Sequence, residues 1–211
     1  MEIEIYADVV CPWCYIGKHR LEQALASYDG DVTVRYRPFQ LDPSPVPQPV
    51  PVVDALAAKF GGPANARQMV ARVTEAAAGA GLRLDYDRAI AANTFDAHRL
   101  VAYAAEHGRA PETVEALYRA HFVDGIDVGS RDALATLAGR VGLDDADVRR
   151  YLDSDEGTKE LAAELAKARD LGISSVPTFV LAGKYGISGA QEPQTMLAAL
   201  AEVERLESGA K

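Results

Sequence analysis

The two cysteines of this 211-residue chain, Cys11 and Cys14, stand three residues apart behind a short strand-like segment. Residues 2–7 alternate apolar and polar side chains, which predicts a strand, and apolar side chains at helical spacing then predict a helix from the cysteines to about Tyr28. The β-rich residues 32–38 predict a second strand. A strand, helix, strand order requires a parallel pair with a right-handed crossover, so the helix that carries both thiols covers a sheet.

The middle of the chain changes character. Residues 41–51 contain five prolines and no strand or helix pattern, which predicts an extended connector. Alanine and charged residues dominate from 52 to 153. Helical patterns follow one another there at 52–60, 63–80, 93–107, 111–123, 130–141 and 144–152. We therefore predict an all-helical inserted domain over residues 52–153.

The C-terminal part returns to a mixed pattern. Its predicted elements are a helix at about 156–171, a strand after Pro177, a hairpin turn at 182–184, a strand at 185–188 and a helix from Pro193. The whole order predicts an α/β fold with a mixed four-stranded sheet and helices on both faces. Residues 1–40 and 154–211 would build this domain.

Charge and hydropathy exclude some functions. The chain has 22 Lys and Arg against 31 Asp and Glu, a net charge of −9, which argues against nucleic acid or an anionic membrane as partner. No apolar run approaches the roughly 20 residues of a membrane span. Taking Met1 as the natural start, the strand pattern directly behind it leaves no room for a secretion signal and predicts a cytoplasmic protein. Disulfides there are mostly transient or catalytic. The sequence makes no prediction of the oligomeric state.

The spacing of the cysteines predicts redox chemistry. Side chains three apart on a helix share a face, close enough for a disulfide. Free N–H groups at the helix N-terminus favour a thiolate at Cys11, and Pro12 suits the first turn. Cys11 would therefore attack a disulfide and Cys14 would resolve the intermediate. A Cys-x-x-Cys that opens a helix behind a strand is typical of thioredoxin-type proteins, which use the redox-active disulfide and need no other cofactor.

Two other uses of the cysteines carry less weight. A structural zinc site needs four ligands. His19 is the nearest candidate, but it would lie about 12 Å along the helix from Cys11 and on a different face from Cys14. We therefore predict no metal. The other alternative is that both cysteines are inert buried thiols.

The dipeptide Val176-Pro177 is the second element of the predicted site. In a thioredoxin fold, the strand after the last crossover begins with a cis-proline packed against the dithiol. A proline before a strand is ordinarily trans, so the earlier dithiol and the topology carry this prediction. The main chain of Val176 would then lie beside Cys11, where a substrate segment can pair as an added strand.

Five segments carry a resemblance to a known family. They are Cys11–Gly17, Asn93–Thr94, Ala97–Leu100, Ser175–Phe179 and Gly186–Gln191. In this order they resemble the DsbA-like thioredoxin family, specifically its FrnE-like branch. The resemblance implies a thioredoxin fold with an inserted helical domain, and thiol–disulfide oxidoreductase or isomerase activity on protein or small-molecule thiols. Some members belong to polyketide biosynthetic pathways.

The chain departs from this pattern at two positions. Thioredoxin-like enzymes often carry a buried acid six residues before the first cysteine, where this chain has Ile5; Asp8 is expected to cap or orient the turn. Trp13 replaces the histidine between the cysteines of DsbA, which implies a milder oxidant. Trp13 is expected to be an exposed part of the substrate surface.

Other residues receive weaker predictions. Asn93 or Thr94 is expected to begin a helix, and the resemblance places that helix over the active site, with His98 in the groove near Cys11. The residue pattern alone favours a surface or capping role for His98. Lys18, on the active-site helix, is expected to be solvated, and His121 to be partly buried in the core.

Two further functions stay open. 2-Hydroxychromene-2-carboxylate isomerases and kappa-class glutathione transferases share the inserted fold and act on small molecules. They use a single serine or thiol-activating group at the first position, so the second thiol, Cys14, favours redox chemistry. The remaining alternative is a non-catalytic chaperone or pathway-binding protein that uses the same groove.

Overall fold

A mixed four-stranded sheet forms the centre of the molecule. The computed structural model describes residues 1–46 and 48–209, so Pro47 of the predicted connector and residues 210–211 lie outside the described chain. The strands are β1 (Glu2–Ala7), β2 (Thr33–Pro38), β3 (Thr178–Leu181) and β4 (Tyr185–Ser188). Their order is β2-β1-β3-β4, with β1 parallel to β2 and antiparallel to β3, as the crossover and the hairpin predict.

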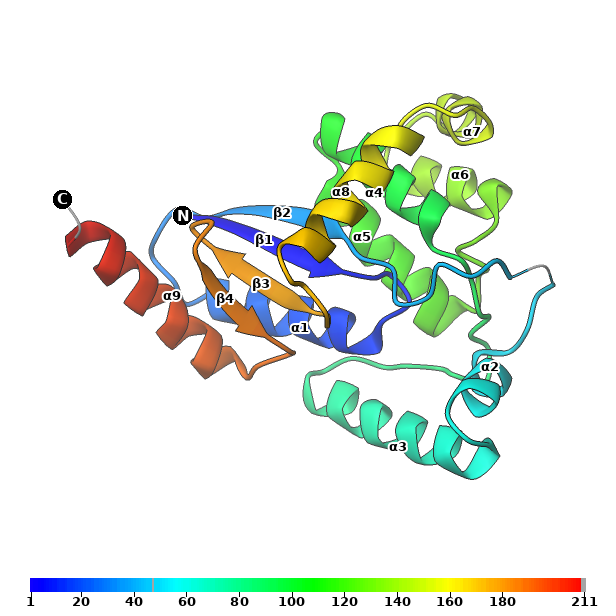
Figure 1. Ribbon diagram of the computed structural model, residues 1–211, viewed down its shortest axis with the longest axis horizontal. Coiled ribbons are helices and arrows are strands. Elements are labelled where there is room, and N and C mark those ends of the chain that lie inside the picture. The colour runs from blue at the N-terminus through cyan, green and yellow to red at the C-terminus, as the bar shows by residue number, and fades with distance from the viewer. Residues whose placement is uncertain (47, 210–211) are drawn as a thin grey trace.

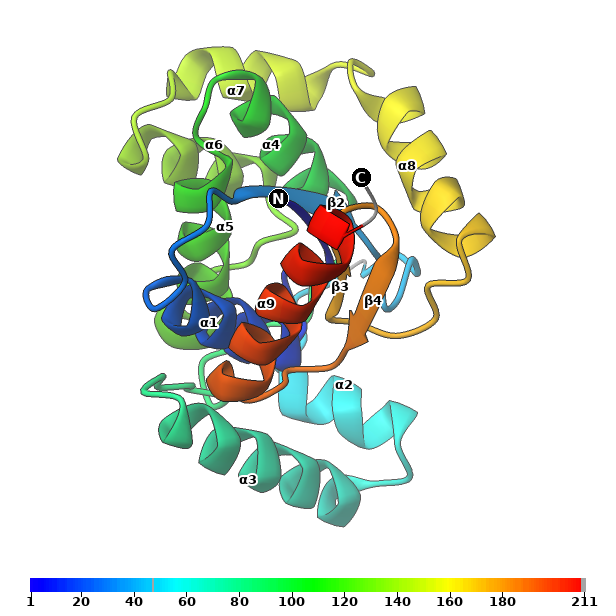
Figure 2. The same cartoon turned by 90° about the vertical axis from the view of Figure 1, so that its left-hand side faces the viewer.

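Helices cover both faces of this sheet. They are α1 (Pro12–Leu25), α8 (Thr158–Asp170) and α9 (Pro193–Gly209). Figure 2 shows α1 and α9 on one side of strands β3 and β4 and α8 on the other side. Helix α1 ends at Leu25 rather than near Tyr28, because the following residues form turns. The fold is therefore thioredoxin-like, as the element order predicts.

Helices between β2 and α8 form the insertion. They are α2 (Val52–Lys59), α3 (Pro63–Gly79), α4 (Phe95–Glu106), α5 (Ala110–Arg119), the π-helical turn η1 (Ala120–Asp124), α6 (Arg131–Arg140) and α7 (Asp145–Asp153). Figure 1 shows α2 and α3 below the beginning of α1 and the other inserted helices above it. The predicted helices agree with these bounds to within a few residues.

The insertion shares its hydrophobic core with the sheet. One cluster of buried apolar side chains runs from Ile3 in β1 through Leu117 in α5 to Val203 in α9. The limits 52–153 for a separate domain therefore stay a prediction. Within the described residues, every helix is too short or too polar to cross a membrane.

Candidate redox site

The dithiol lies where β1 turns into α1. The N–H of Cys11 donates to the carbonyl of Asp8 at 3.0 Å, and helix α1 begins at Pro12, directly behind Cys11. Both cysteines are free thiols, and their exposed fractions are 4% and 1%. The N–H of Cys14 donates to the carbonyl of Cys11 at 3.0 Å, so both sulfurs belong to the first helical turn. This is the arrangement that the spacing of the cysteines predicts.

Pro177 lies against the dithiol from the other end of the chain. The Val176–Pro177 peptide bond is cis, as predicted, and the Cys11 Sγ donates a long hydrogen bond of 3.8 Å to the carbonyl of Val176. A methyl group at Gly17 would lie 2.9 Å from Cγ of Pro177, closer than carbon atoms tolerate. Helix α1 therefore approaches the proline closely because residue 17 has no side chain.

Cys14 is the deeper of the two thiols. Burial raises the pKa of Cys14 well above its ordinary value, and the neighbouring Cys11 and the charge of Asp8 raise it further. The main chain of Asp8 acts in the opposite direction and lowers the pKa of Cys14. Because burial is the largest effect, Cys14 is a protonated thiol at neutral pH.

A buried carboxylate and a buried histidine meet beside the dithiol. Asp8 is 1% exposed, and its Oδ2 accepts from the N–H of Leu41 at 2.8 Å. Nε2 of His98 lies 3.3 Å from Oδ1 of Asp8 and 3.0 Å from the carbonyl of Phe39. Since a carbonyl only accepts, Nε2 carries the proton. The surface or capping role for His98 is wrong: it is 5% exposed and faces the turn before Cys11.

The sequence pattern missed this pair. Asp8 is expected to cap or orient the turn, but its carboxylate makes no cap hydrogen bond to α1; it accepts from Leu41 and faces His98 instead. Ile5, six residues before Cys11, is an apolar core residue of β1. Asp8 and His98 are 90 residues apart, so local spacing carried no signal of their contact. The sequence contains one signal for a buried acid near the dithiol, which is Asp8 itself, three residues before Cys11.

The remaining predicted groove residues surround this centre. Trp13 is 38% exposed, as expected, and Pro12 and Val176 are half-buried. Asn93 holds the connector: its Nδ2 donates to the carbonyls of Pro43 and Ser44 at 3.0 and 3.1 Å. Its Oδ1 accepts from the N–H of Phe95 at 3.0 Å at the start of α4. Asn93 therefore supports the wall of the site, and these hydrogen bonds lie away from the thiols.

Helix α5 of the insertion contacts α1 beside the dithiol. Glu115 accepts from Nζ of Lys18 at 2.8 Å and from the hydroxyl of Tyr15 at 2.9 Å. The Tyr15 ring stacks on Tyr118 with centroids 4.9 Å apart. The expectation that Lys18 is solvated is therefore wrong, because it is 4% exposed and paired with Glu115 and Glu22.

His121, in η1, is a second buried histidine near the site. It is 1% exposed, deeper than the partial burial expected, and its Nδ1 has no partner among the described residues. Burial lowers the pKa of His121 to about 4, and the charge of Asp8 opposes this shift. His121 is therefore neutral in the folded protein at neutral pH.

We expect His121 to make the protein less stable in mild acid. The unfolded chain takes up a proton near pH 6.5 and the folded chain only near pH 4. Its contribution to the free energy of unfolding is thus fully present above pH 6.5 and falls by about 3 kcal/mol as pH drops to 4. Urea unfolding of the wild type and of His121→Leu between pH 4 and 7 measures it: the variant should lose less stability. Parallel curves would contradict the shift.

Arg99 is a buried cation that the sequence analysis did not single out. It is 1% exposed, and its Nη1 pairs with Asp96 at 2.7 Å. Its other donors go to main-chain carbonyls where α7 leads into α8. These carbonyls belong to Tyr151, Leu152, Ser154 and Glu156. Arg99 thus fixes α4 to the segment that returns the chain to the sheet.

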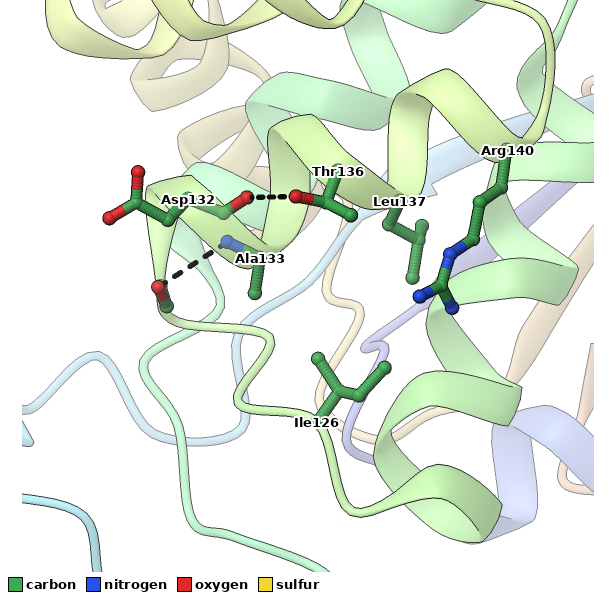
Figure 3. Close-up of a pocket in the computed structure, with 7 residues that line it drawn as sticks. Ile126, Asp132, Ala133, Thr136, Leu137 and Arg140 are labelled. Carbon is green, nitrogen blue, oxygen red and sulfur yellow. Dashed lines mark hydrogen bonds between the residues drawn. The ribbon is translucent and has the colours of Figure 1, made fainter.

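A separate hollow of about 360 Å³ lies on the insertion around α6 (Figure 3). Two of its polar groups are used within the helix: Thr136 donates to the carbonyl of Asp132, and Ser130 accepts from the N–H of Ala133. It lies apart from the dithiol. In residues 1–46 and 48–209, no three His, Cys, Asp or Glu side chains gather as metal ligands.

The sheet order, the paired thiols at the start of α1 and the proline beside them define a thioredoxin-like protein with a helical insertion. The chain matches the DSBA-like thioredoxin domain over residues 2–201 and belongs to this family. Its members are oxidoreductases in general.

The similarity to known proteins covers most or all of the chain. A probable DsbA oxidoreductase from Streptomyces coelicolor is 37% identical, with a TM-score of 0.89 over 96% of this chain and 89% of its own. The uncharacterized protein YwbO of Bacillus subtilis is 30% identical over 90% of both chains. A 2-hydroxychromene-2-carboxylate isomerase superposes with a TM-score of 0.73 over 100% of both chains at 18% identity, which shows the fold alone.

Proposed function

We propose that the protein is a thiol–disulfide oxidoreductase in which Cys11 attacks and Cys14 resolves. The observation that carries the proposal is the position of the Cys11 sulfur, 3.8 Å from the carbonyl of Val176 and at the start of α1. A substrate segment that pairs with the main chain of Val176 would bring its own sulfur to Cys11. Exposed Trp13 would add apolar contact area to this surface.

The reaction proceeds through two exchanges. The Cys11 thiolate attacks one sulfur of a substrate disulfide, the substrate S–S bond breaks, and one substrate thiolate leaves. The Cys14 thiolate then attacks Cys11, forms the Cys11–Cys14 disulfide and releases the second substrate thiolate. The substrate gains two electrons and the protein loses two; the reverse sequence oxidises a dithiol.

Cys14 separates this proposal from its alternatives. An isomerase or transferase of the 2-hydroxychromene-2-carboxylate isomerase or kappa glutathione transferase kind needs one group at the position of Cys11. A second thiol in the same helical turn serves resolution. We propose protein or small-molecule disulfides as substrates, the internal disulfide as the only redox group, and the cytoplasm as the working compartment.

A redox titration tests the proposal. We expect one two-electron transition between about −270 and −120 mV, the range from thioredoxin to DsbA. It should lie toward the thioredoxin end, because Trp13 brings no positive charge that would stabilise the thiolate form. The protein is equilibrated with dithiothreitol or glutathione buffers, alkylated and weighed by mass spectrometry. Cys14→Ser, which cannot form the internal disulfide, is the control. If both thiols stay reduced over this whole range of potentials, the proposed function is refuted.

A further inference from the structure

Two segments from distant parts of the chain flank the strand that leads to the dithiol. β1 lies between β2 and β3 in the sheet. β2 runs parallel to β1 and ends where Pro38 pairs with Ala7, and β3 runs antiparallel to β1 and begins where Thr178 pairs with Tyr6. The connector behind β2 and the Val176 segment before β3 therefore meet the same edge of the sheet as the dithiol turn, on opposite sides of β1.

We propose that Leu41, in the connector, is a specificity-determining residue that selects polypeptide disulfides with an apolar side chain close to the reacting cysteine. The inference rests on the proposed redox function and concerns which partners that function favours. Val176 can pair with the main chain of a partner, and such pairing does not depend on the partner's side chains. Leu41 would supply a side-chain contact on the other side of β1.

The main chain of the connector is held in place where it passes the dithiol turn. The N–H of Leu41 donates to the Asp8 carboxylate at 2.8 Å, and the carbonyl of Asp8 accepts from the N–H of Cys11 at 3.0 Å. Nδ2 of Asn93 donates to two connector carbonyls just behind Leu41. The Leu41 side chain is nevertheless 46% exposed. Because its main chain is already fixed, a partner that covers this side chain has little further structure to order.

The composition of the connector favours an apolar occupant. Pro43 and Pro45 have no N–H, so this segment cannot pair with a partner as a full strand and contacts it mainly through side chains. The neighbouring carboxylate, Asp42, is paired with Lys59 of α2 at 2.7 Å. Leu41 therefore presents apolar area beside a compensated charge, and burial of apolar area stabilises a complex.

The spacing of the strands indicates where the selected residue lies in the partner. β2 and β3 are two strand spacings apart, about 10 Å, with β1 halfway between them. An extended partner advances about 3.3 Å per residue. A partner whose sulfur meets Cys11 would therefore reach Leu41 with a residue about two positions from its own cysteine.

Competition between two peptide disulfides measures this selection. Each is the disulfide-linked dimer of a short peptide with a central cysteine; one peptide has leucine two positions away on both sides, and the other has serine there. Both react in equal amounts with the Cys14→Ser protein, and mass spectrometry counts the two adducts on Cys11. We expect about ten leucine adducts for each serine adduct, the scale of partial burial of a leucine side chain. Competition for reduced glutathione corrects for the reactivity of the peptides themselves.

Further substitutions in the Cys14→Ser protein assign this ratio to Leu41. Leu41→Ser should lower it to less than about threefold, whereas Leu206→Ser, at an exposed leucine of α9, should keep it; α9 extends away from the connector (Figure 1). Asn93→Asp keeps an acceptor for the N–H of Phe95 but loses both donors to the connector, so we expect an intermediate ratio. Both peptides meet the same sample, so the ratio does not depend on the folded fraction.

Several results would overturn the inference. They are a ratio near one before further substitution, a ratio that Leu41→Ser leaves at about tenfold, and an equal fall in Leu206→Ser. Sedimentation of the wild type and of Leu41→Ser tests the other occupant of this surface: a dimer that the substitution dissociates would assign Leu41 to a contact with a second copy of the chain. A Cys14→Ser protein that forms no adduct with either peptide would instead refute the proposed function.

Discussion

A Cys14→Ser variant is expected to accumulate a covalent Cys11–substrate disulfide, while a Cys11→Ser variant captures nothing. In both variants turnover of a disulfide substrate should fall by about 10³-fold or more, the scale of loss when a nucleophile is removed. The physical reason is the depth of the two sulfurs: the Cys11 sulfur reaches the carbonyl of Val176, and Cys14 lies behind it. Mass spectrometry of the intact protein after mixing with a disulfide-bonded peptide measures both results.

Serine is a matched replacement in both places, so thermal unfolding should show that each variant keeps its fold. Trapping in Cys11→Ser with none in Cys14→Ser would reverse the assigned roles. Wild-type activity in Cys14→Ser would move the chain toward the single-group chemistry of the isomerase and transferase alternatives.

Arg99→Met is expected to lower the free energy of unfolding by about 3–5 kcal/mol, the scale of breaking a buried charged network. Arg99 is 1% exposed and donates to four main-chain carbonyls, two in the last turn of α7 and two in the segment that leads to α8, in addition to Asp96. Methionine has a similar volume but no donor, so Asp96 and the carbonyls of Leu152, Ser154 and Glu156 would lose the hydrogen bonds of Arg99, while the Tyr151 carbonyl keeps those from Ser154. Urea unfolding followed by circular dichroism measures the loss.

Arg150→Met is the matched control, since Arg150 lies on the neighbouring helix α7, is 73% exposed and pairs with Asp147 at the surface. Its unfolding midpoint should equal that of the wild type. Arg99→Lys should recover part of the loss, because lysine keeps the charge but not the planar array of donors. A loss for Arg99→Met no larger than that for Arg150→Met would contradict the anchoring role.

The local sequence pattern was sufficient to predict most of the fold. The alternation in β1, the turn residues between β3 and β4 and the alanine-rich periodicity of the insertion each report a property of neighbouring residues. The cysteine pair is local too, since one helical turn contains it. The cis form of the Val176–Pro177 bond needed the fold as well, because proline before a strand does not distinguish the two isomers.

The errors concern buried polar groups. Lysine, histidine and aspartate are seldom fully buried in proteins. The sequence therefore predicted a surface or capping position for Lys18, His98 and Asp8. Their burial depends on partners that the chain supplies much later: Glu115 for Lys18, and α4 for Asp8. These contacts depend on how the helices of the insertion pack against α1 and the turn before it, which local sequence pattern does not specify.

The order of the strands also determines when the thiols become protected during synthesis. Tyr6 in β1 pairs with Thr178 in β3, so this half of the sheet cannot close until β3 has left the ribosome. At 5–20 residues per second, both cysteines are made about 8–35 s before β3. For that interval the nascent chain offers two nucleophilic sulfurs without the Val176 carbonyl beside them. The contact between the Cys11 sulfur and the Val176 carbonyl can thus form only after this late segment has been made.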